Sequence, residues 1–187
     1  MDKIFLFDLE TTGLDKKRHA IHQISGKVII DDVVKESFDF KVRPWEGCEF
    51  EPKALEVGGV TQEQLMQYPP MMDVYKELIA LLDKYVDKYN KADKFFMMGY
   101  NIAGFDCDFL REFFIMCGNK FFGSYFWSVP LDVMVLAQAK LIKERPTMPD
   151  FKQGTVAKQL GVVIEEDKLH DASYDTWACY EIYKRLV

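Results

Sequence analysis

The chain has 187 residues, of which 49% are hydrophobic and 14% aromatic, and its formal net charge is −6. This length suits one domain with a sizeable core, and the composition excludes a disordered chain. The acidic balance argues against a protein that coats long stretches of duplex DNA, because such proteins are usually basic. It leaves room for a protein that contacts nucleic acid at a few points through bound metal ions, which carry the positive charge.

Three further features set the expected location. No apolar run approaches the ~20 residues that a membrane span needs, and charged residues 2 and 3 lead directly into the first strand without a signal peptide. The four cysteines are scattered, with no Cys-x-x-Cys pair, which suits a reducing compartment and gives no zinc signal. We therefore expect a single domain over residues 1–187, in the cytoplasm and with no membrane contact.

The first predicted element is a buried strand over Ile4–Phe7, and it leads directly into Asp8 and Glu10. Side chains alternate across a strand, so these two acids point to the same face. Two acids at the end of a buried strand need a neutralising group, and a divalent cation fits because hard cations prefer oxygen ligands. Residues 11–13 then turn the chain.

A polar loop follows over residues 14–19, and it has two interpretations: a solvated hairpin tip, or a small patch that contacts phosphate. Residues 20–30 and 33–42 are β-rich runs around the acidic pair Asp31-Asp32. Together with the first strand they predict an antiparallel meander.

The middle of the chain alternates loops with helices. Residues 43–60 indicate a loop with one helical turn, and Thr61 with Gln64 forms a capping box that opens a short helix. Pro69-Pro70 interrupts this helix. Asp73 is then expected to be the N-cap of a longer helix that ends near Asn90.

The rest of the chain alternates strands and helices. Strands are expected over 94–98 and 126–131, and helices over 104–117, from Asp132 as N-cap to Lys143, over 155–160 ending at Gly161, and from 172 to the end. Three strands followed by this alternation predict an α/β domain with a mixed central sheet.

Two more acids and a histidine complete a candidate site. Asp106 lies in the first turn of a helix that follows a strand, Asp175 lies in the last helix, and His170 precedes it by five residues. Taken singly, these are ordinary surface, turn or helix-end residues. If they meet Asp8 and Glu10, the four carboxylates repel one another strongly and become ligands for two divalent ions, which suit in-line phosphoryl displacement. A nearby histidine suits a general base for the attacking water.

The flanking residues strengthen this reading, because three segments resemble the motifs of the DEDDh group of 3′→5′ exonucleases. This group includes the proofreading epsilon subunit of bacterial DNA polymerase III, ribonuclease T and oligoribonuclease. The first motif is Phe-Asp-Leu-Glu-Thr-Thr-Gly-Leu over residues 7–14. The second is Gly99-Tyr100-Asn101 with Phe105-Asp106, and the third is the His-x4-Asp spacing of 170–175. The resemblance covers nearly the whole chain.

The resemblance implies a ribonuclease H-like fold with a mixed five-stranded central sheet flanked by helices, and two Mg²⁺ or Mn²⁺ ions. By matching position it makes Asp8, Glu10, Asp106 and Asp175 the metal ligands and His170 the general base. Thr11, Leu14 and Phe105 correspond to residues that contact the terminal nucleotide. Gln23 is expected to have a structural role.

The chain departs from the family pattern at three places. Asn101 stands four residues before Phe105, a register similar to the exonuclease I type, so its contact with substrate is left open. Gly58 stands where the family often has a histidine, so one nucleotide contact is expected to be missing. The chain also lacks the C-terminal tail by which the epsilon subunit joins its polymerase, so we expect any polymerase association to use another surface.

The resulting functional hypothesis is a metal-dependent 3′→5′ exonuclease that removes nucleoside 5′-monophosphates from single-stranded ends, with DNA favoured. RNA trimming of the oligoribonuclease or ribonuclease T kind is the near alternative, because the motifs do not read the 2′-hydroxyl. A catalytically silent nucleic-acid-binding or scaffold member, and an unrelated α/β domain with coincidental acids, are the remaining alternatives.

Overall fold

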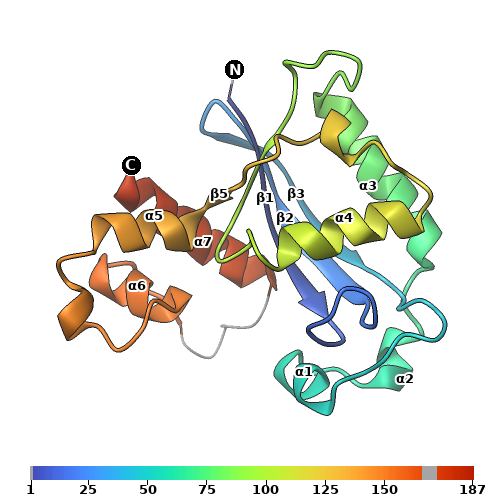
Figure 1. Cartoon of the computed structure of the whole chain (residues 1–187), viewed down its shortest axis with the longest axis horizontal. Coiled ribbons are helices and arrows are strands. Elements are labelled where there is room, and N and C mark those ends of the chain that lie inside the picture. The colour runs from blue at the N-terminus through green and yellow to red at the C-terminus, as the bar shows by residue number, and fades with distance from the viewer. Residues whose placement is uncertain (1, 166–171) are drawn as a thin grey trace.

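Five strands form one sheet in the order β3-β2-β1-β4-β5 in the computed structural model, which describes residues 2–165 and 172–187 (Figure 1). The strands are β1 (Lys3–Thr11), β2 (Ile21–Ile30), β3 (Val33–Lys41), β4 (Phe96–Gly99) and β5 (Leu131–Asp132). β1, β2 and β3 pair antiparallel, whereas β4 and β5 run parallel to β1. The predicted mixed five-stranded sheet is therefore confirmed.

Helices cover both faces of this sheet. The α-helices are α1 (Pro52–Val57), α2 (Gln62–Leu65), α3 (Met71–Tyr85), α4 (Asp106–Met116), α5 (Val133–Lys140), α6 (Gln153–Gln159) and α7 (Ala172–Leu186). Two 3₁₀ turns, η1 (Phe122–Ser124) and η2 (Arg145–Thr147), lie in the connections. In Figure 1, α3 and α4 lie on one side of the sheet and α5, α6 and α7 on the other.

Alternation along β1 divides the core in two. Phe5, Phe7 and Leu9 belong to the apolar cluster that includes residues of α3 and α4. Ile4 and Leu6 point the other way, into the cluster formed with α5, α6 and α7. Asp8 and Glu10 continue the series of Ile4 and Leu6, so both acids face the α7 side, as the strand periodicity predicts.

The hairpin between β2 and β3 follows the prediction closely. Asp31 and Asp32 both have positive φ, 49° and 61°, which is the conformation of a two-residue turn that matches the twist of the flanking strands. Aspartate tolerates this region better than most residues. The acidic pair therefore fixes the register in which β2 pairs with β3.

The predicted boundaries of three elements are wrong. α3 begins at Met71 with Pro70 as its N-cap, so Asp73 lies inside the first turn, and the helix ends at Tyr85 rather than near Asn90. β5 spans two residues instead of six, with an isolated bridge between Phe95 and Phe126 before it. α5 ends at Lys140, not Lys143. The capping box of Thr61 and Gln64 is confirmed.

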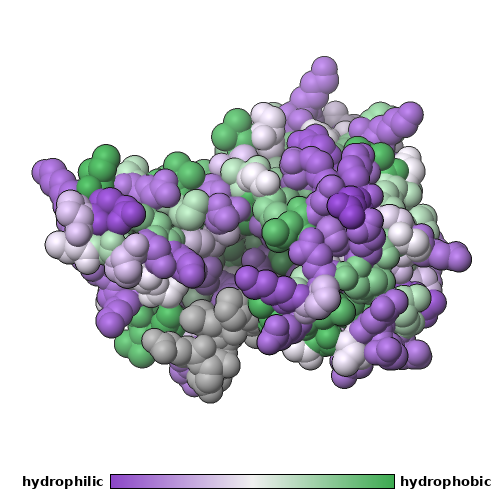
Figure 2. Space-filling model, turned by 60° about the horizontal axis from the view of Figure 1, so that its bottom comes forward, coloured by the Kyte–Doolittle hydropathy of each residue, from purple (hydrophilic) through white to green (hydrophobic). Residues whose placement is uncertain are grey.

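The surface is hollowed between the part that holds α5, α6 and α7 and the larger part that holds the sheet, α3 and α4 (Figure 2). Hydrophilic side chains line much of the rim of this hollow. Over the described part of the chain, every helix is too short or too polar to cross a membrane.

Candidate active site

The candidate site begins at the last residues of β1, where the strand leaves its pairing with β4. β1 pairs with β4 only as far as Leu6, and Asp8 and Glu10 extend beyond that point. On the other edge, Glu10 lies opposite Gln23 of β2, whose side-chain amide donates a 2.7 Å hydrogen bond to Asp39. Gln23 is thus held by β3, in agreement with its expected structural role.

Asp106 reaches the same place from α4. Its side chain is 5% exposed, and its Oδ1 accepts a hydrogen bond of 3.2 Å from the backbone N–H of Leu9, between the two acids of β1. Burial raises the pKa of Asp106 to about 7, against the opposing effect of the backbone N–H groups of Leu9 and of Asp106 itself. The first turn of α4 and the end of β1 are therefore joined through a carboxylate.

Asp8 lies at the electrostatic centre of the four acids. Its pKa is raised well above the usual value, first by desolvation and then by the negative charges of Asp106, Glu10 and Asp175. Asp175 comes from the first turn of α7, and its backbone carbonyl accepts a 2.8 Å hydrogen bond from the Gln153 amide. The structure thus brings the other three predicted carboxylates within electrostatic reach of Asp8.

The donor chemistry fits hard divalent cations. Carboxylate oxygens are their preferred ligands, and a cation would offset the repulsion that raises the pKa of Asp8. Among residues 2–165 and 172–187, no three acidic, histidine or cysteine side chains already form a compact metal cage. The fit therefore rests on charge and ligand type. The predicted base, His170, lies outside the described residues.

The turn after β1 forms a rigid platform. The Thr11 hydroxyl donates a 2.8 Å hydrogen bond to the carbonyl oxygen of Gly13, and Thr12 is fully buried. The Thr12 hydroxyl donates to the Glu49 carbonyl oxygen at 2.7 Å and accepts from the Ala20 N–H at 2.9 Å. The hydroxyl of the predicted substrate residue Thr11 is therefore engaged within the turn, and contact of Thr11 with substrate stays a prediction.

A pocket of about 250 Å³ opens beside this platform, between residues 14–16 and the start of α4. Leu14, whose side chain is 75% exposed, forms one wall. Phe105, which is half-buried and whose ring centroid lies 4.8 Å from that of Phe109 in a tilted arrangement, forms the other. The two predicted nucleotide contacts Leu14 and Phe105 thus face a common space.

A second, larger hollow of about 890 Å³ opens next to Asp175. Its walls come from α6 and from residues 161–164, and they include Lys152 and Lys158. The four acids therefore lie between a small pocket, next to the platform, and a wider one next to α6.

Asn101 stands apart from these pockets. It has a positive φ of 61° and lies at the surface, and its backbone N–H donates to Asp132 Oδ1 at 3.0 Å. Its defined contact is therefore with the fold, and contact with substrate stays a prediction.

Sequence reasoning recognised Asp132 as a helix cap but missed its second task. The buried carboxylate accepts hydrogen bonds of 3.0 Å from the N–H groups of Asn101, Ala103 and Met134. It thereby ties the start of α5 to the loop that leads to Phe105 and Asp106. The strand-end aspartate at a parallel sheet edge was the available signal.

The loop over residues 14–19 is mostly exposed, as its interpretation as a solvated tip predicts, since residues 14, 15, 17 and 18 lie at the surface. Lys16 pairs with Asp108, Lys17 with Glu112 at 2.7 Å, and Arg18 with Glu49 at 2.8 Å, so each of these cations already has an acidic partner. His19, at 4% exposure, is buried beneath the loop. The alternative interpretation, a patch that contacts phosphate, stays a prediction.

Comparison with known proteins agrees with this site. Residues 5–183 match the exonuclease family RNase_T. The chain therefore belongs to this exonuclease family, which confirms the expected resemblance and the enzyme class.

Three relatives show how the family domain is used elsewhere. The chain is 24% identical to a PolC-type DNA polymerase III of Mycoplasmopsis pulmonis, over 95% of this chain and 11% of that protein. It is 27% identical to a DNA polymerase III subunit epsilon-like protein of Rhodobacter capsulatus, over 100% of this chain and 24% of that one. It is also 27% identical to ribonuclease T of Photorhabdus laumondii, over 97% of this chain and 82% of that one.

Solved structures of Escherichia coli exonuclease I share the fold. A complex with a dT13 oligonucleotide superposes with a TM-score of 0.78 at 20% identity, over 98% of this chain and 40% of that one. A zinc-bound form of the exonuclease I complex with single-stranded DNA gives a TM-score of 0.77 at 19% identity, over 100% of this chain and 40% of that one. The chain thus spans about a tenth of the PolC-type polymerases and two fifths of exonuclease I that it matches.

Proposed function

We propose that this domain is a metal-dependent 3′→5′ exonuclease that releases nucleoside 5′-monophosphates from single-stranded ends, with DNA favoured over RNA. The observation that carries the proposal is the convergence of three acids, from β1, α4 and α7, on Asp8, whose ionisation their charges oppose. The adjoining platform and pocket have the position that a terminal nucleotide requires. The oligonucleotide complexes of exonuclease I support DNA as the substrate.

In this proposal Asp8, Glu10, Asp106 and Asp175 hold two Mg²⁺ or Mn²⁺ ions. When bound, two such ions supply the positive charge that stabilises the attacking and leaving oxygens of an in-line phosphoryl displacement. Asp106 keeps its fixed orientation through the Leu9 N–H. His170 accepts the proton of the attacking water, and Leu14 and Phe105 hold the terminal nucleotide between them.

The wider hollow then receives the next nucleotides of the strand. Lys152 and Lys158 on its wall are suited to the phosphates, since lysine acts as a point charge toward phosphate oxygens. A soluble, cytoplasmic setting is part of the proposal, and the four cysteines are free thiols, as a reducing compartment requires.

The test follows digestion of a 5′-labelled single-stranded dT oligonucleotide in Mn²⁺. A ladder that shortens from the 3′ end, with thymidine 5′-monophosphate as product, is the expected result. Asp8→Ala should lose the activity while keeping the circular dichroism spectrum of the folded protein. Digestion by Asp8→Ala at the wild-type rate would show that another site acts.

Trimming of RNA is the second candidate, and it is favoured by the ribonuclease T relative, 82% of whose length aligns with this chain. Matched DNA and RNA oligonucleotides, single- and double-stranded, separate the two. Faster release from single-stranded RNA would replace DNA as the preferred substrate, and release from neither would favour a silent binding or scaffold member. Association with a DNA polymerase, as the polymerase relatives suggest, is a further part of the proposal and is tested by co-purification.

A further inference from the structure

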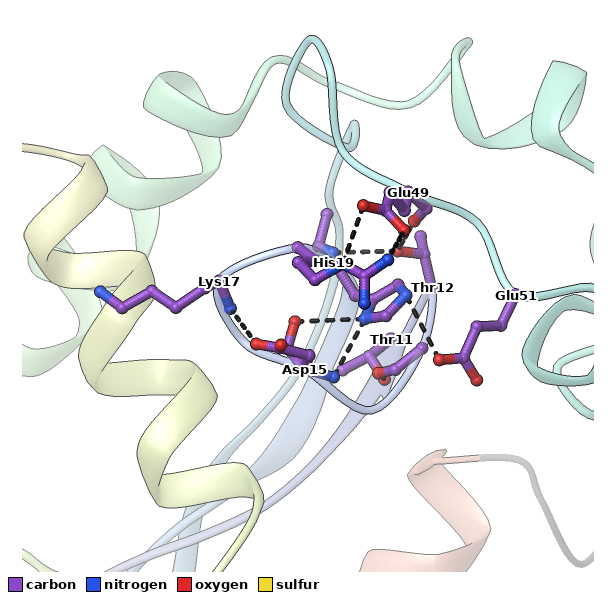
Figure 3. A network of polar contacts seen from close by, with 10 residues as sticks. Thr11, Thr12, Asp15, Lys17, His19, Glu49 and Glu51 are labelled. Atoms are coloured by element: carbon purple, nitrogen blue, oxygen red, sulfur yellow. Dashed lines mark hydrogen bonds and ion pairs between the residues drawn. The ribbon is translucent and has the colours of Figure 1, made fainter.

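His19 lies buried under the loop that follows the first motif, although its neighbours are charged and exposed. Its Nδ1 is 3.0 Å from the backbone N–H of Asp15, which donates to it, and its Nε2 is 3.3 Å from Glu51 Oε1 (Figure 3). With Nδ1 accepting, the neutral ring carries its proton on Nε2 and donates it to the carboxylate. Both nitrogens are therefore engaged, so the ring has one orientation.

The ring also supports the platform directly. A Cβ added at Gly13 would lie 2.4 Å from His19 Cδ2, a distance that no side chain tolerates. The imidazole is thus packed against the Gly13 backbone, in the centre of the Thr11–Leu14 turn. This contact explains why a glycine stands there. It also makes the position of the turn backbone relative to the sheet depend on the ring.

Glu51 connects the platform to a second segment of the chain. Its backbone N–H donates to the Thr12 carbonyl oxygen at 2.8 Å, while its side chain receives His19 Nε2. Figure 3 shows Glu51 approaching the ring from the side opposite Asp15. Glu51 therefore holds the turn through one main-chain contact and one side-chain contact, and the Glu49 carbonyl adds its hydrogen bond with the Thr12 hydroxyl.

We infer that His19 and Glu51 are positioning residues for the terminal nucleotide. They fix the position of the turn backbone, and so place Leu14 in the 250 Å³ pocket opposite Phe105. They act through Gly13 and Thr12, not by touching the substrate. This inference rests on the proposed exonuclease function, and it concerns the binding of the last nucleotide of the strand.

Two substitutions test the pair. Glu51→Ala removes the carboxylate that accepts from His19. Because the Glu51 side chain is 43% exposed, folding should be unaffected. His19→Ala removes the ring itself. For the p-nitrophenyl ester of thymidine 5′-monophosphate, whose nucleotide occupies only the terminal site, we expect KM to rise roughly tenfold in each variant while kcat stays within about twofold. A partly unfolded enzyme gives the opposite pattern, with lower kcat and unchanged KM.

Two controls sharpen the result. Glu51→Gln keeps an acceptor for the Nε2–H, so it should restore a KM close to that of the wild type. Lys17→Ala breaks the surface ion pair of the same loop with Glu112, and it should leave KM unchanged because Lys17 is 65% exposed and does not contact the ring.

The outcomes are separable from those of the proposed function. If the wild type releases no nitrophenol or nucleotide in Mn²⁺, the proposed function and this inference both fall. If the wild type is active and both alanine variants keep its KM, the inference alone is overturned. Should His19→Ala fail to fold, Glu51→Ala decides the question.

Discussion

Asp8 shows how a single residue can serve the site at a cost to the fold. Its carboxyl is desolvated and faces three other acids, so its pKa is higher in the folded chain than in the unfolded one. A group of this kind destabilises the fold at every pH above its unfolded pKa, because ionisation is then easier in the unfolded chain. The four acids therefore form a strained cluster that only function explains.

This reasoning predicts that Asp8→Asn makes the protein more stable while abolishing exonuclease activity. In EDTA at pH 8, we expect the thermal unfolding midpoint to rise by roughly 3 °C for each kcal/mol of repulsion removed. The gain should shrink as pH falls toward 4, because Asp8 is then increasingly protonated in the unfolded chain as well as in the folded one. Circular dichroism melts measure it, and a lower midpoint for Asp8→Asn at pH 8 would contradict the account.

His22 is a second residue whose burial has a measurable consequence. It is 2% exposed, and both ring nitrogens lack a hydrogen-bond partner within the described structure. Burial, with a contribution from Lys41, lowers its pKa from 6.5 to about 4. The folded chain thus keeps His22 neutral over a range in which the unfolded chain protonates it, so this group makes stability rise with pH between about 4 and 6.5.

We expect His22→Leu to remove this contribution. The shift from 6.5 to about 4 corresponds to ~3 kcal/mol at its full extent, reached at pH 4. The free energy of unfolding of the variant, relative to that of the wild type, should therefore be higher at pH 4.5 than at pH 7.5, so the variant gains stability at low pH. Urea unfolding at the two pH values checks this, and comparing the variant with wild type cancels the opposite slope from the acids. A pH-independent difference would rule out the buried neutral histidine.

The four acids and His19 differ in how far the sequence predicted them. The four acids were predictable because the motif spacing places them at the ends of particular strands and helices. The burial of His19 was not, because a histidine within a run of charged residues has no local signal that separates it from its exposed neighbours. Its position depends on Gly13 and on Glu51, 32 positions further along the chain.

Among the elements, the β1–β3 meander was the most predictable part. Its strands are long, its apolar alternation is clear, and the Asp31-Asp32 turn fixes the register. The short β5 was harder, because tertiary packing and not strand propensity decides where pairing with β4 begins. The start of α3 was misplaced since Pro70 supplies a rigid entry to the helix, so a capping side chain is not needed at Asp73.

The junction of β5 and α5 carries a prediction of its own. Asp132 accepts three backbone hydrogen bonds, two of them from the loop before Asp106. Asp132→Ala should lower the free energy of unfolding by about 3 kcal/mol, through a lost cap and buried N–H groups without acceptors. It should also lower kcat, because the loop that leads to Asp106 loses its anchor. Chemical denaturation and steady-state kinetics measure the two effects.

Asp150→Ala is the matched control for this experiment. Asp150 also accepts from a backbone N–H and a hydroxyl at the start of a helix, those of Lys152 and Thr155, but it is only partly buried, whereas Asp132 is buried. We expect a much smaller loss of stability and unchanged kcat. Equal effects of the two substitutions would mean that Asp132 acts as a helix cap and no more.

At the scale of the whole molecule, charge sets how the domain meets nucleic acid. The chain carries a net charge of −6, and the cations of the loop over residues 14–19 are paired with acids. This distribution does not favour binding through many phosphate contacts. Among the described residues, the cations that line the hollow beside Asp175 are Lys152, which precedes α6, and Lys158 of α6.

Weak dependence of binding on salt follows from this charge distribution. Each phosphate contact on a single strand contributes about 0.7 to the slope of log affinity against log salt. For a dT oligonucleotide bound to Asp8→Ala, we expect affinity to fall with salt with a slope of magnitude about 1.5, from the two contacts of Lys152 and Lys158. The slope should be near zero after both lysines are changed to alanine. Fluorescence anisotropy gives the slope, and a value above about 4 would reveal a basic surface that the fold does not show.

The central claim is that Asp8, Glu10, Asp106 and Asp175 together hold divalent cations. The most direct measurement is a calorimetric titration of the wild type with Mn²⁺ at pH 8 in the presence of thymidine 5′-monophosphate, repeated with Asp8→Asn and Asp106→Asn. The account predicts two Mn²⁺ per chain in the wild type and fewer in each variant. An absence of binding by the wild type, or full binding by both variants, would contradict it.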